Sequence, residues 1–138
     1  MSEKELDIRW QQRLSNLASA CRLLTEVDQY DELSTPAIIR EGFVQRFEIT
    51  FDLAWKTLKD YLDYQGIPVQ PTPRAVVKEA FAVGVIKDGE QFIQMLGTRN
   101  VMSHRYDEEA FNETFRLIKH GYARTLSVLV DDLQSVAQ

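Results

Sequence analysis

The sequence predicts an all-α fold, an antiparallel up-and-down bundle of about five helices, four long and one short. Long segments carry apolar residues at spacings of three and four, which is the period of an amphipathic helix. No segment shows the apolar alternation of a half-buried strand, and prolines mark the connections between the periodic segments. The chain is therefore expected to be a single helical-bundle domain, 1–138, long enough to bury a sizeable core.

The first two helices are predicted over about 5–28 and about 36–64. Each carries one apolar stripe: Trp10, Leu14, Leu17, Cys21 and Leu24 in the first, and Phe43, Phe47, Phe51, Ala54, Leu58 and Tyr61 in the second. Further apolar residues widen the second stripe, so this helix is expected to be central and to touch more than one neighbour. Thr35 followed by Pro36 predicts an N-cap with proline at the first helical position.

The third and fourth helices are shorter. Thr72 and Pro73 repeat the cap-then-proline pattern and open a helix over about 73–83, with Ala75, Val76, Val77, Ala80 and Phe81 as its apolar positions. A fourth helix is predicted from near Asp88 towards Arg99. Gly97 lies in its middle, where a glycine permits close approach of another backbone.

The last helix is predicted over about 108–136, with Asp107 as its N-cap. Its apolar stripe has spacings of four, three, four, four, three, four and three, and consists of Phe111, Phe115, Ile118, Tyr122, Leu126, Leu129, Leu133 and Val136. This spacing is that of one apolar face of an amphipathic helix.

Composition limits the classes of partner and location. The net charge is −5, so the chain lacks the overall basic character of a protein that binds duplex nucleic acid. The single cysteine, Cys21, excludes an intramolecular disulfide and favours a reducing compartment. The polar N-terminus is unlike a secretory signal, and no apolar run is long enough for a membrane span. A cytoplasmic protein with no membrane partner is expected.

The candidate functional site is the segment from Arg99 to Tyr106, which reads Arg-Asn-Val-Met-Ser-His-Arg-Tyr. It is too polar to be explained by packing alone. On an ideal helix, Arg99 and His104 flank one strip of surface, Asn100 shares the face of His104, and Tyr106 returns to the side of Arg99. Ser103 shares the next face with Arg99.

These residue types suit cleavage of a phosphodiester without a metal. Arginine offers planar, paired donors to a phosphate and to the charge that develops on it. Histidine ordinarily titrates near neutral pH and can transfer protons. An RNA 2′-hydroxyl supplies the nucleophile, so the protein need not. No metal or cofactor is expected, because no second histidine or cysteine lies at ligand spacing; His120 belongs to another helix and is expected to face solvent.

Simpler interpretations stay open for the same residues. Arg99 can pair with a carboxylate such as Glu90 or Asp107, His104 can bond a carbonyl at a helix end, and Tyr106 can be a packing residue. Cys21 lies on an apolar stripe and is expected to be a buried thiol.

Two acidic residues of the second helix look like a catalytic pair. Glu48 and Asp52 lie four apart on one face, but we expect them to pair with Arg46 or Lys56 and assign them no catalysis.

Three blocks of the sequence resemble a known family. They are Phe47-Glu48-x-x-Phe51-Asp52-x-Ala54-Trp55-Lys56, then Pro73-Arg74 with Glu79-Ala80-Phe81, then Met95-Leu96-x-x-Arg99-Asn100-x-x-Ser103-His104-x-Tyr106. The last block resembles the motif of HEPN domains, small all-α proteins of which many are ribonucleases or toxins. The ordered set of three is similar to the nucleotidyltransferase substrate-binding protein family, over roughly residues 10–130.

The resemblance implies a HEPN-like helical bundle, typically a homodimer, whose partner is a separate minimal nucleotidyltransferase. In toxin–antitoxin members, the HEPN protein is a ribonuclease that its partner silences by transferring AMP to the motif tyrosine. Carried over, Arg99 and His104 would be catalytic and Tyr106 the AMP acceptor. Asn100, Ser103 and Arg105 would support phosphate binding, with Arg99 and Arg105 making the groove locally basic.

Two functions therefore remain open at this stage. One is a metal-independent ribonuclease acting on RNA, and the other is a non-catalytic substrate-binding subunit of a two-component nucleotidyltransferase. The chain has no nucleotidyltransferase active site of its own, because no Gly-Ser followed by spaced aspartates is present.

Overall fold

The computed structural model describes residues 1–137, and these form helices and loops without a strand. The helices are α1 (Glu3–Thr25), η1 (Glu26–Gln29), α2 (Ala37–Tyr64), α3 (Pro73–Ala82), α4 (Gly89–Met102), α5 (Glu108–Leu117), η2 (Ile118–Tyr122) and α6 (Ala123–Val136). The predicted all-α bundle is confirmed, with the predicted last helix formed by α5, η2 and α6 in succession. None of the helices in the described part of the chain is long and apolar enough to cross a bilayer.

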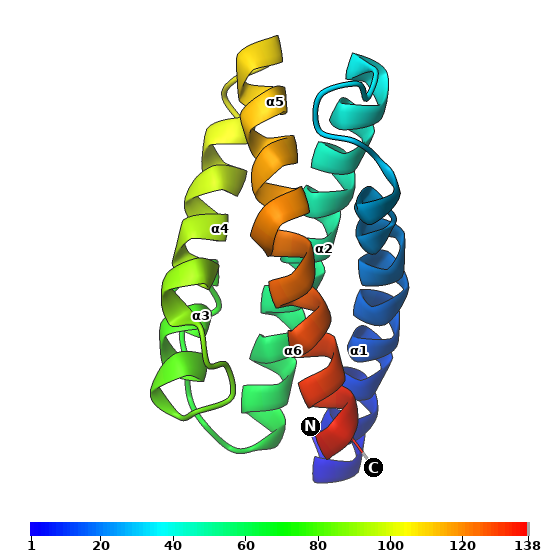
Figure 1. Cartoon of the computed structure of the whole chain (residues 1–138). Coiled ribbons are helices and arrows are strands. Elements are labelled where there is room, and N and C mark those ends of the chain that lie inside the picture. Colours follow the sequence, from blue (N-terminus) through cyan, green and yellow to red (C-terminus); the bar gives the residue numbers. More distant parts are fainter. Residues whose placement is uncertain (138) are drawn as a thin grey trace.

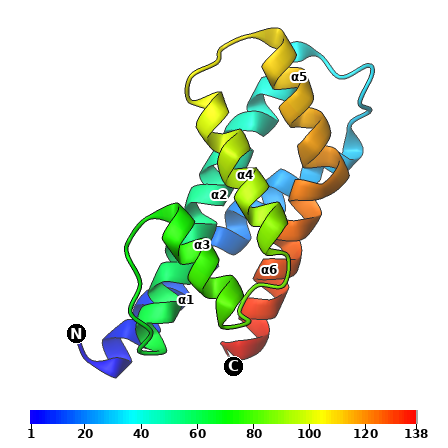
Figure 2. The same cartoon turned by 90° about the vertical axis from the view of Figure 1, so that its left-hand side faces the viewer.

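The helices run up and down along one axis (Figure 1). α2 contacts α1, α3, α4, α5 and α6, so it is the central helix that its wide apolar stripe predicted. α3 and α4 lie on one side of α2 (Figure 1), the side that faces the viewer in Figure 2. Both termini lie at one end of the bundle, and the start of α5 and the loop before α2 lie together at the other.

One hydrophobic core runs between the helices, and the predicted stripes supply most of it. All five residues of the first stripe are buried, as are Phe43, Phe47, Phe51, Ala54 and Leu58 of the second. Two predicted core positions are wrong: Phe81 is 52% exposed at the end of α3, and Val136 is 54% exposed in the last turn of α6.

Cys21 is buried, as predicted. Burial, together with the nearby charge of Asp131, raises the pKa of the Cys21 thiol to about 11. The thiol therefore stays protonated at neutral pH and takes no part in nucleophilic chemistry.

The long C-terminal helix contains a π-helical turn, η2, between α5 and α6. The stripe carries two successive spacings of four at this place, which suits the wider turn of a π-helix. At Gly121 in this turn, a Cβ atom would come within 2.9 Å of Nε2 of Gln91 on α4, the end of a flexible side chain that can move aside. Next to it, the buried Tyr122 shares a hydrogen bond of 2.8 Å with the Thr98 hydroxyl, which fixes α4 just before Arg99.

Two of the three predicted helix caps are confirmed. Side-chain oxygens of Thr72 and Asp107 accept from backbone N–H groups of α3 and α5, and Asp88 caps α4 in the same way. The prediction for Thr35 is wrong, because Pro36 occupies the N-cap position of α2 and the Thr35 hydroxyl instead donates to the carbonyl of Asp31.

Candidate functional site

The candidate segment starts in a helix but does not remain helical. α4 ends at Met102, and the backbone N–H groups of His104 and Arg105 both donate to the carbonyl of Val101 in a closing turn, at 3.0 and 3.1 Å. The prediction that Tyr106 lies on the Arg99 side of one helix is therefore wrong. The polar residues instead follow a helix end and the loop to α5.

Arg99, in the last turn of α4, is held by Asp52 of α2. Its Nε donates to Oδ1 at 3.2 Å and its Nη2 donates to Oδ2 at 2.9 Å, a two-point ion pair. Arg99 thus pairs with a carboxylate, as one of the simpler interpretations allowed, but with Asp52 rather than with Glu90 or Asp107. Asp52 occupies one edge of the guanidinium, and no residue among 1–137 accepts a hydrogen bond from Nη1 on the other edge.

A second carboxyl group adds negative charge beside this pair. Glu48 lies one turn before Asp52 on α2, and burial raises its pKa, a shift that Arg99 opposes and the charge of Asp52 reinforces. The hydrogen bonds to Asp52 likewise raise the pKa of Arg99, so this arginine stays charged. Glu48 and Asp52 were expected to pair with Arg46 or Lys56, but Asp52 pairs with Arg99 and Arg46 pairs with Glu26 at 3.0 Å.

His104 is exposed, two residues beyond the end of α4. Its backbone closes the helix, but its imidazole forms no hydrogen bond with any residue in the described range 1–137. The alternative of a histidine bonded to a helix-end carbonyl is therefore not what the structure contains. The imidazole is accessible to a ligand.

The three supporting residues lie around this helix end. Asn100 is exposed in the last turn of α4, and the Ser103 hydroxyl donates to the Asn100 carbonyl at 2.6 Å. Arg105 donates from Nε and Nη2 to the two carboxylate oxygens of Asp107, both at 2.9 Å. Arg99 and Arg105 are thus each held by a carboxylate through Nε and Nη2. The positive charge expected to make the groove locally basic is therefore partly neutralised within the chain.

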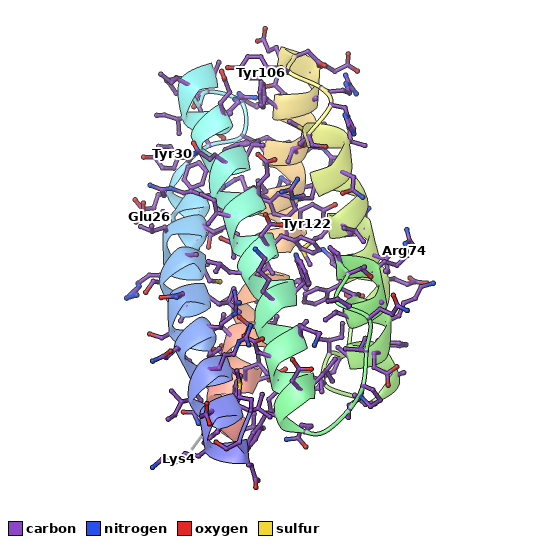
Figure 3. The ribbon with its side chains drawn as sticks, turned by 180° about the vertical axis from the view of Figure 1, so that it is seen from behind. Lys4, Glu26, Tyr30, Arg74, Tyr106 and Tyr122 are labelled. Carbon is purple, nitrogen blue, oxygen red and sulfur yellow. The ribbon has the colours of Figure 1, made fainter. Side chains whose placement is uncertain are left out.

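Tyr106 lies between α2 and α5 at the end of the bundle opposite the termini (Figure 3). It is 87% exposed, its ring meets that of Phe111 edge-on at 5.1 Å, and its hydroxyl donates to Oε1 of Glu41 at 3.3 Å. The three residues border a shallow pocket of about 210 Å³ between the starts of α2 and α5. The single edge contact with Phe111 leaves most of the phenol exposed. Packing alone therefore does not explain why a tyrosine stands at this position.

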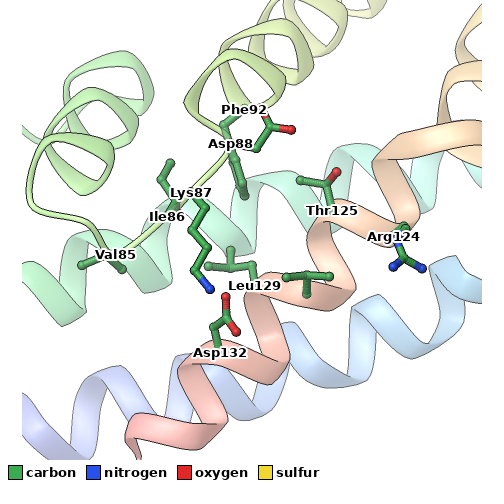
Figure 4. A pocket seen from close by; sticks show the side chains of 10 residues that line it. Val85, Ile86, Lys87, Asp88, Phe92, Arg124, Thr125, Leu129 and Asp132 are labelled. Carbon is green, nitrogen blue, oxygen red and sulfur yellow. The ribbon is translucent and has the colours of Figure 1, made fainter.

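Neither of two other hollows on the described surface is lined by Arg99, His104 or Tyr106. One of about 200 Å³ lies between the loop before α4 and α6, where the side chain of Lys87 points towards Asp132 (Figure 4). Another, of about 470 Å³, lies between α4 and α5 and is bordered by Gly97 and Arg105. Within residues 1–137, no group of three or more histidine, cysteine or acidic side chains is placed to hold a metal ion.

Sequence reasoning missed two residues of this site, Asp52 and Glu41. Each contacts a motif residue, and the partners are 47 and 65 positions apart in the chain, so no local pattern reveals the contact. Asp52 does lie in the first of the three family-like blocks. That position was the only signal in the sequence that could have identified it.

Comparison with known proteins decides the family. The family described as nucleotidyltransferase substrate binding protein like matches residues 12–135, nearly the whole chain. The chain belongs to the nucleotidyltransferase substrate-binding protein family. The resemblance found in the three blocks is thereby confirmed.

Two relatives support this membership of the nucleotidyltransferase substrate-binding protein family. The chain is 28% identical over 82 residues to the probable ribonuclease HepT of Haemophilus influenzae, an alignment that covers 54% of this chain and 56% of that protein. It therefore aligns with little more than half the length of that curated relative. A crystal structure of a protein from Thermus thermophilus has the same fold, with a TM-score of 0.72 and 28% identity over 88% of this chain and 98% of that one.

Proposed function

We propose that the chain is a HEPN-type, metal-independent ribonuclease, the toxin of a pair whose antitoxin is a minimal nucleotidyltransferase. The observation that carries this is the exposed, unbonded imidazole of His104 just beyond an arginine held in place by a carboxylate. A helix end built only for packing needs neither feature. The likeness to a probable ribonuclease supports the same reaction class.

The mechanism needs only groups that the chain and RNA provide. The RNA 2′-hydroxyl attacks the adjacent phosphorus, a cyclic phosphate forms, and the 5′-oxygen of the next nucleotide leaves with a proton. His104 moves these protons. Arg99 binds the phosphate with its Nη1 edge while Asp52 holds the opposite edge, so the guanidinium needs little reorganisation as charge develops.

The direct test is the purified wild-type chain, free of AMP, incubated with single-stranded RNA in the presence of EDTA. We expect cleavage that leaves cyclic phosphate ends, and growth inhibition when the chain is produced alone. If the chain neither cleaves RNA nor inhibits growth, the proposal that it is a ribonuclease is overturned. The chain would then be a non-catalytic substrate-binding subunit, in which the same Arg99 and His104 hold a nucleotide phosphate.

Asp52→Asn should lower RNA cleavage far more than it lowers stability. The pair with Arg99 is about one-third exposed, so its loss should cost only about 0.2–1 kcal/mol of unfolding free energy in a urea titration. The guanidinium then loses its fixed edge, and cleavage should fall about tenfold or more, because positioning is lost. Glu26→Gln is the matched control, since Glu26 pairs with Arg46 at similar exposure away from the motif. Equal cleavage by the Asp52 and Glu26 variants would contradict the positioning role.

The proposed active unit is a homodimer in which α4 approaches its copy. A Cβ atom at Gly97 would meet no atom within 4 Å, so nothing within the described chain requires glycine at this position. Gly97→Leu should therefore stabilise the helix of the isolated chain, by about 0.8 kcal/mol, and yet weaken the dimer. Light scattering at tens of micromolar should give twice the 16.0 kDa chain mass for wild type and a smaller mass for the variant. Gly42→Leu, at the other open helical glycine, is the control. If wild type is only a monomer at this concentration, the proposed homodimer is wrong.

The partner nucleotidyltransferase is proposed to silence the chain by modifying Tyr106. The phenolic oxygen loses its proton to solvent and forms a bond to the α-phosphorus of ATP, pyrophosphate leaves, and AMP remains on the tyrosine. The exposure of Tyr106 supports this role, because the modifying enzyme must reach the hydroxyl. The nucleotide would then lie on the same short loop as His104.

A further inference from the structure

Three exposed side chains gather at one end of the bundle. Leu33, Tyr106 and Ile38 are 89%, 87% and 79% exposed, more than any other large apolar side chain in residues 1–137. They come from the loop before α2, the loop before α5 and the first turn of α2, which meet at the end opposite the chain termini (Figure 1 and Figure 3). We call the surface of Leu33, Ile38, Glu41 and Tyr106 the end face.

The loop that carries Leu33 is held rigidly by Arg40. Its guanidinium donates to the carbonyls of Glu32 and Thr35, both at 2.8 Å, and to the side chain of Asn112 on α5 at 3.0 Å. The Glu32 side chain in turn lies 2.8 Å from the ring of His120. Because the loop is already fixed, binding a partner through Leu33 costs little loop entropy. An exposed apolar side chain on such a loop is typical of a binding surface.

The end face is continuous around Tyr106. Ile38 and Glu41 are three apart on α2 and share a side of the helix, and Glu41 accepts the hydrogen bond from the tyrosine hydroxyl. Ala37, beside Ile38, borders the same pocket as Tyr106. A partner that covers Tyr106 and Glu41 therefore lies within one helical turn of Ile38.

The charge around the end face selects the kind of partner. Asp31, Glu41, Glu108 and Glu109 surround it, and none of them forms an ion pair in the part of the chain that the structure describes. Arg105 is already held by Asp107, and Arg40 by the loop. Such a surface repels an RNA backbone and favours a protein with basic side chains around an apolar centre.

We propose that the end face is the docking surface of the nucleotidyltransferase partner, with Leu33 and Ile38 as its apolar anchors. This rests on the proposed function, since Tyr106 belongs both to the end face and to the loop of His104. The partner should offer an apolar hollow with lysine or arginine at its rim. Docking there brings its active site to the exposed hydroxyl of Tyr106 without contact with the chain's core.

The test uses Leu33→Asp, Ile38→Asp and, as a matched control, Ile8→Asp. Ile8 is 48% exposed near the start of α1, at the other end of the bundle. Binding to the nucleotidyltransferase encoded beside this chain is measured by calorimetry, AMP addition by intact mass, and oligomeric state by light scattering. Each end-face variant should bind about tenfold more weakly or worse, as at an interface anchor. The control should bind like wild type, and all variants should keep the wild-type oligomeric state.

The outcomes separate the docking surface from the AMP transfer. If wild type is modified and both end-face variants bind and are modified like it, the docking surface is wrong while the AMP transfer stands. If both variants lose binding but wild type gains no AMP, the docking surface stands and the AMP transfer fails. If the variants instead lose self-association, the face is an interface between copies, and the proposal is overturned. A wild type that does not bind the nucleotidyltransferase overturns it as well.

Discussion

His104→Ala should remove RNA cleavage and growth inhibition while leaving the helical bundle intact. Proton transfer by a positioned side chain is worth about 10²–10⁴-fold in rate, and the chain offers no second imidazole on the same loop. The side chain is exposed and unbonded, so its loss should change the unfolding free energy by less than about 0.5 kcal/mol. Cleavage of a fluorescent RNA and urea denaturation measure the two effects.

The other histidine gives the matched control for this experiment. His120 is also exposed, and its ring lies 2.8 Å from a Glu32 oxygen, in the turn that follows α5 rather than in the motif loop. His120→Ala should cleave RNA like wild type. If both histidine variants retain full activity, His104 does not transfer the proton, and the ribonuclease proposal loses its main support.

Arg99→Ala should lower the rate for a different reason. It removes a preorganised donor to the developing charge, a loss of about 2.7–4 kcal/mol if it resembles removal of one oxyanion-hole donor. Asp52 is left without its partner, but its side chain is 36% exposed and can be hydrated. Arg46→Ala is the control, because it removes the arginine of a different ion pair, the one between Arg46 and Glu26. It should leave RNA cleavage unchanged.

The fold was predictable because each helix carries its own periodic signal. Apolar spacings of three and four identify a buried stripe from neighbouring residues alone, and residues such as Trp10, Phe47 and Leu126 are fully buried where that pattern places them. Cap residues act within one turn, so Thr72 and Asp107 were predictable as well. Thr35 was not, because its hydroxyl is bonded to the preceding turn.

The site was less predictable because its contacts join distant segments. The pattern identified Arg99, His104 and Tyr106, but it could not show that Asp52 holds the first and Glu41 contacts the last. It also extended α4 through the motif, since Ser103 and His104 are compatible with a helix. The helix ends at Met102 because the carbonyl of Val101 is used to close the turn, which sends Tyr106 towards α2.

Tyr106→Phe should keep full RNA cleavage and become insensitive to the nucleotidyltransferase partner supplied with ATP. The phenol is 87% exposed and its hydroxyl makes one hydrogen bond, of 3.3 Å to Glu41, so removing the oxygen should barely change stability. The ring contact with Phe111 remains in the variant. Only the atom that would accept AMP is lost.

The expected inhibition follows from where the added group lies. AMP on Tyr106 places a negative phosphodiester on the loop that carries His104 and beside Arg105, where it competes with the RNA phosphate for the same donors. Intact-mass spectrometry should show AMP on wild type, none on Tyr106→Phe, and normal addition to Tyr30→Phe, a tyrosine packed against Phe43. If the partner still modifies Tyr106→Phe, or adds nothing to wild type, Tyr106 is not the acceptor. Its exposure must then serve contact with RNA or with another protein.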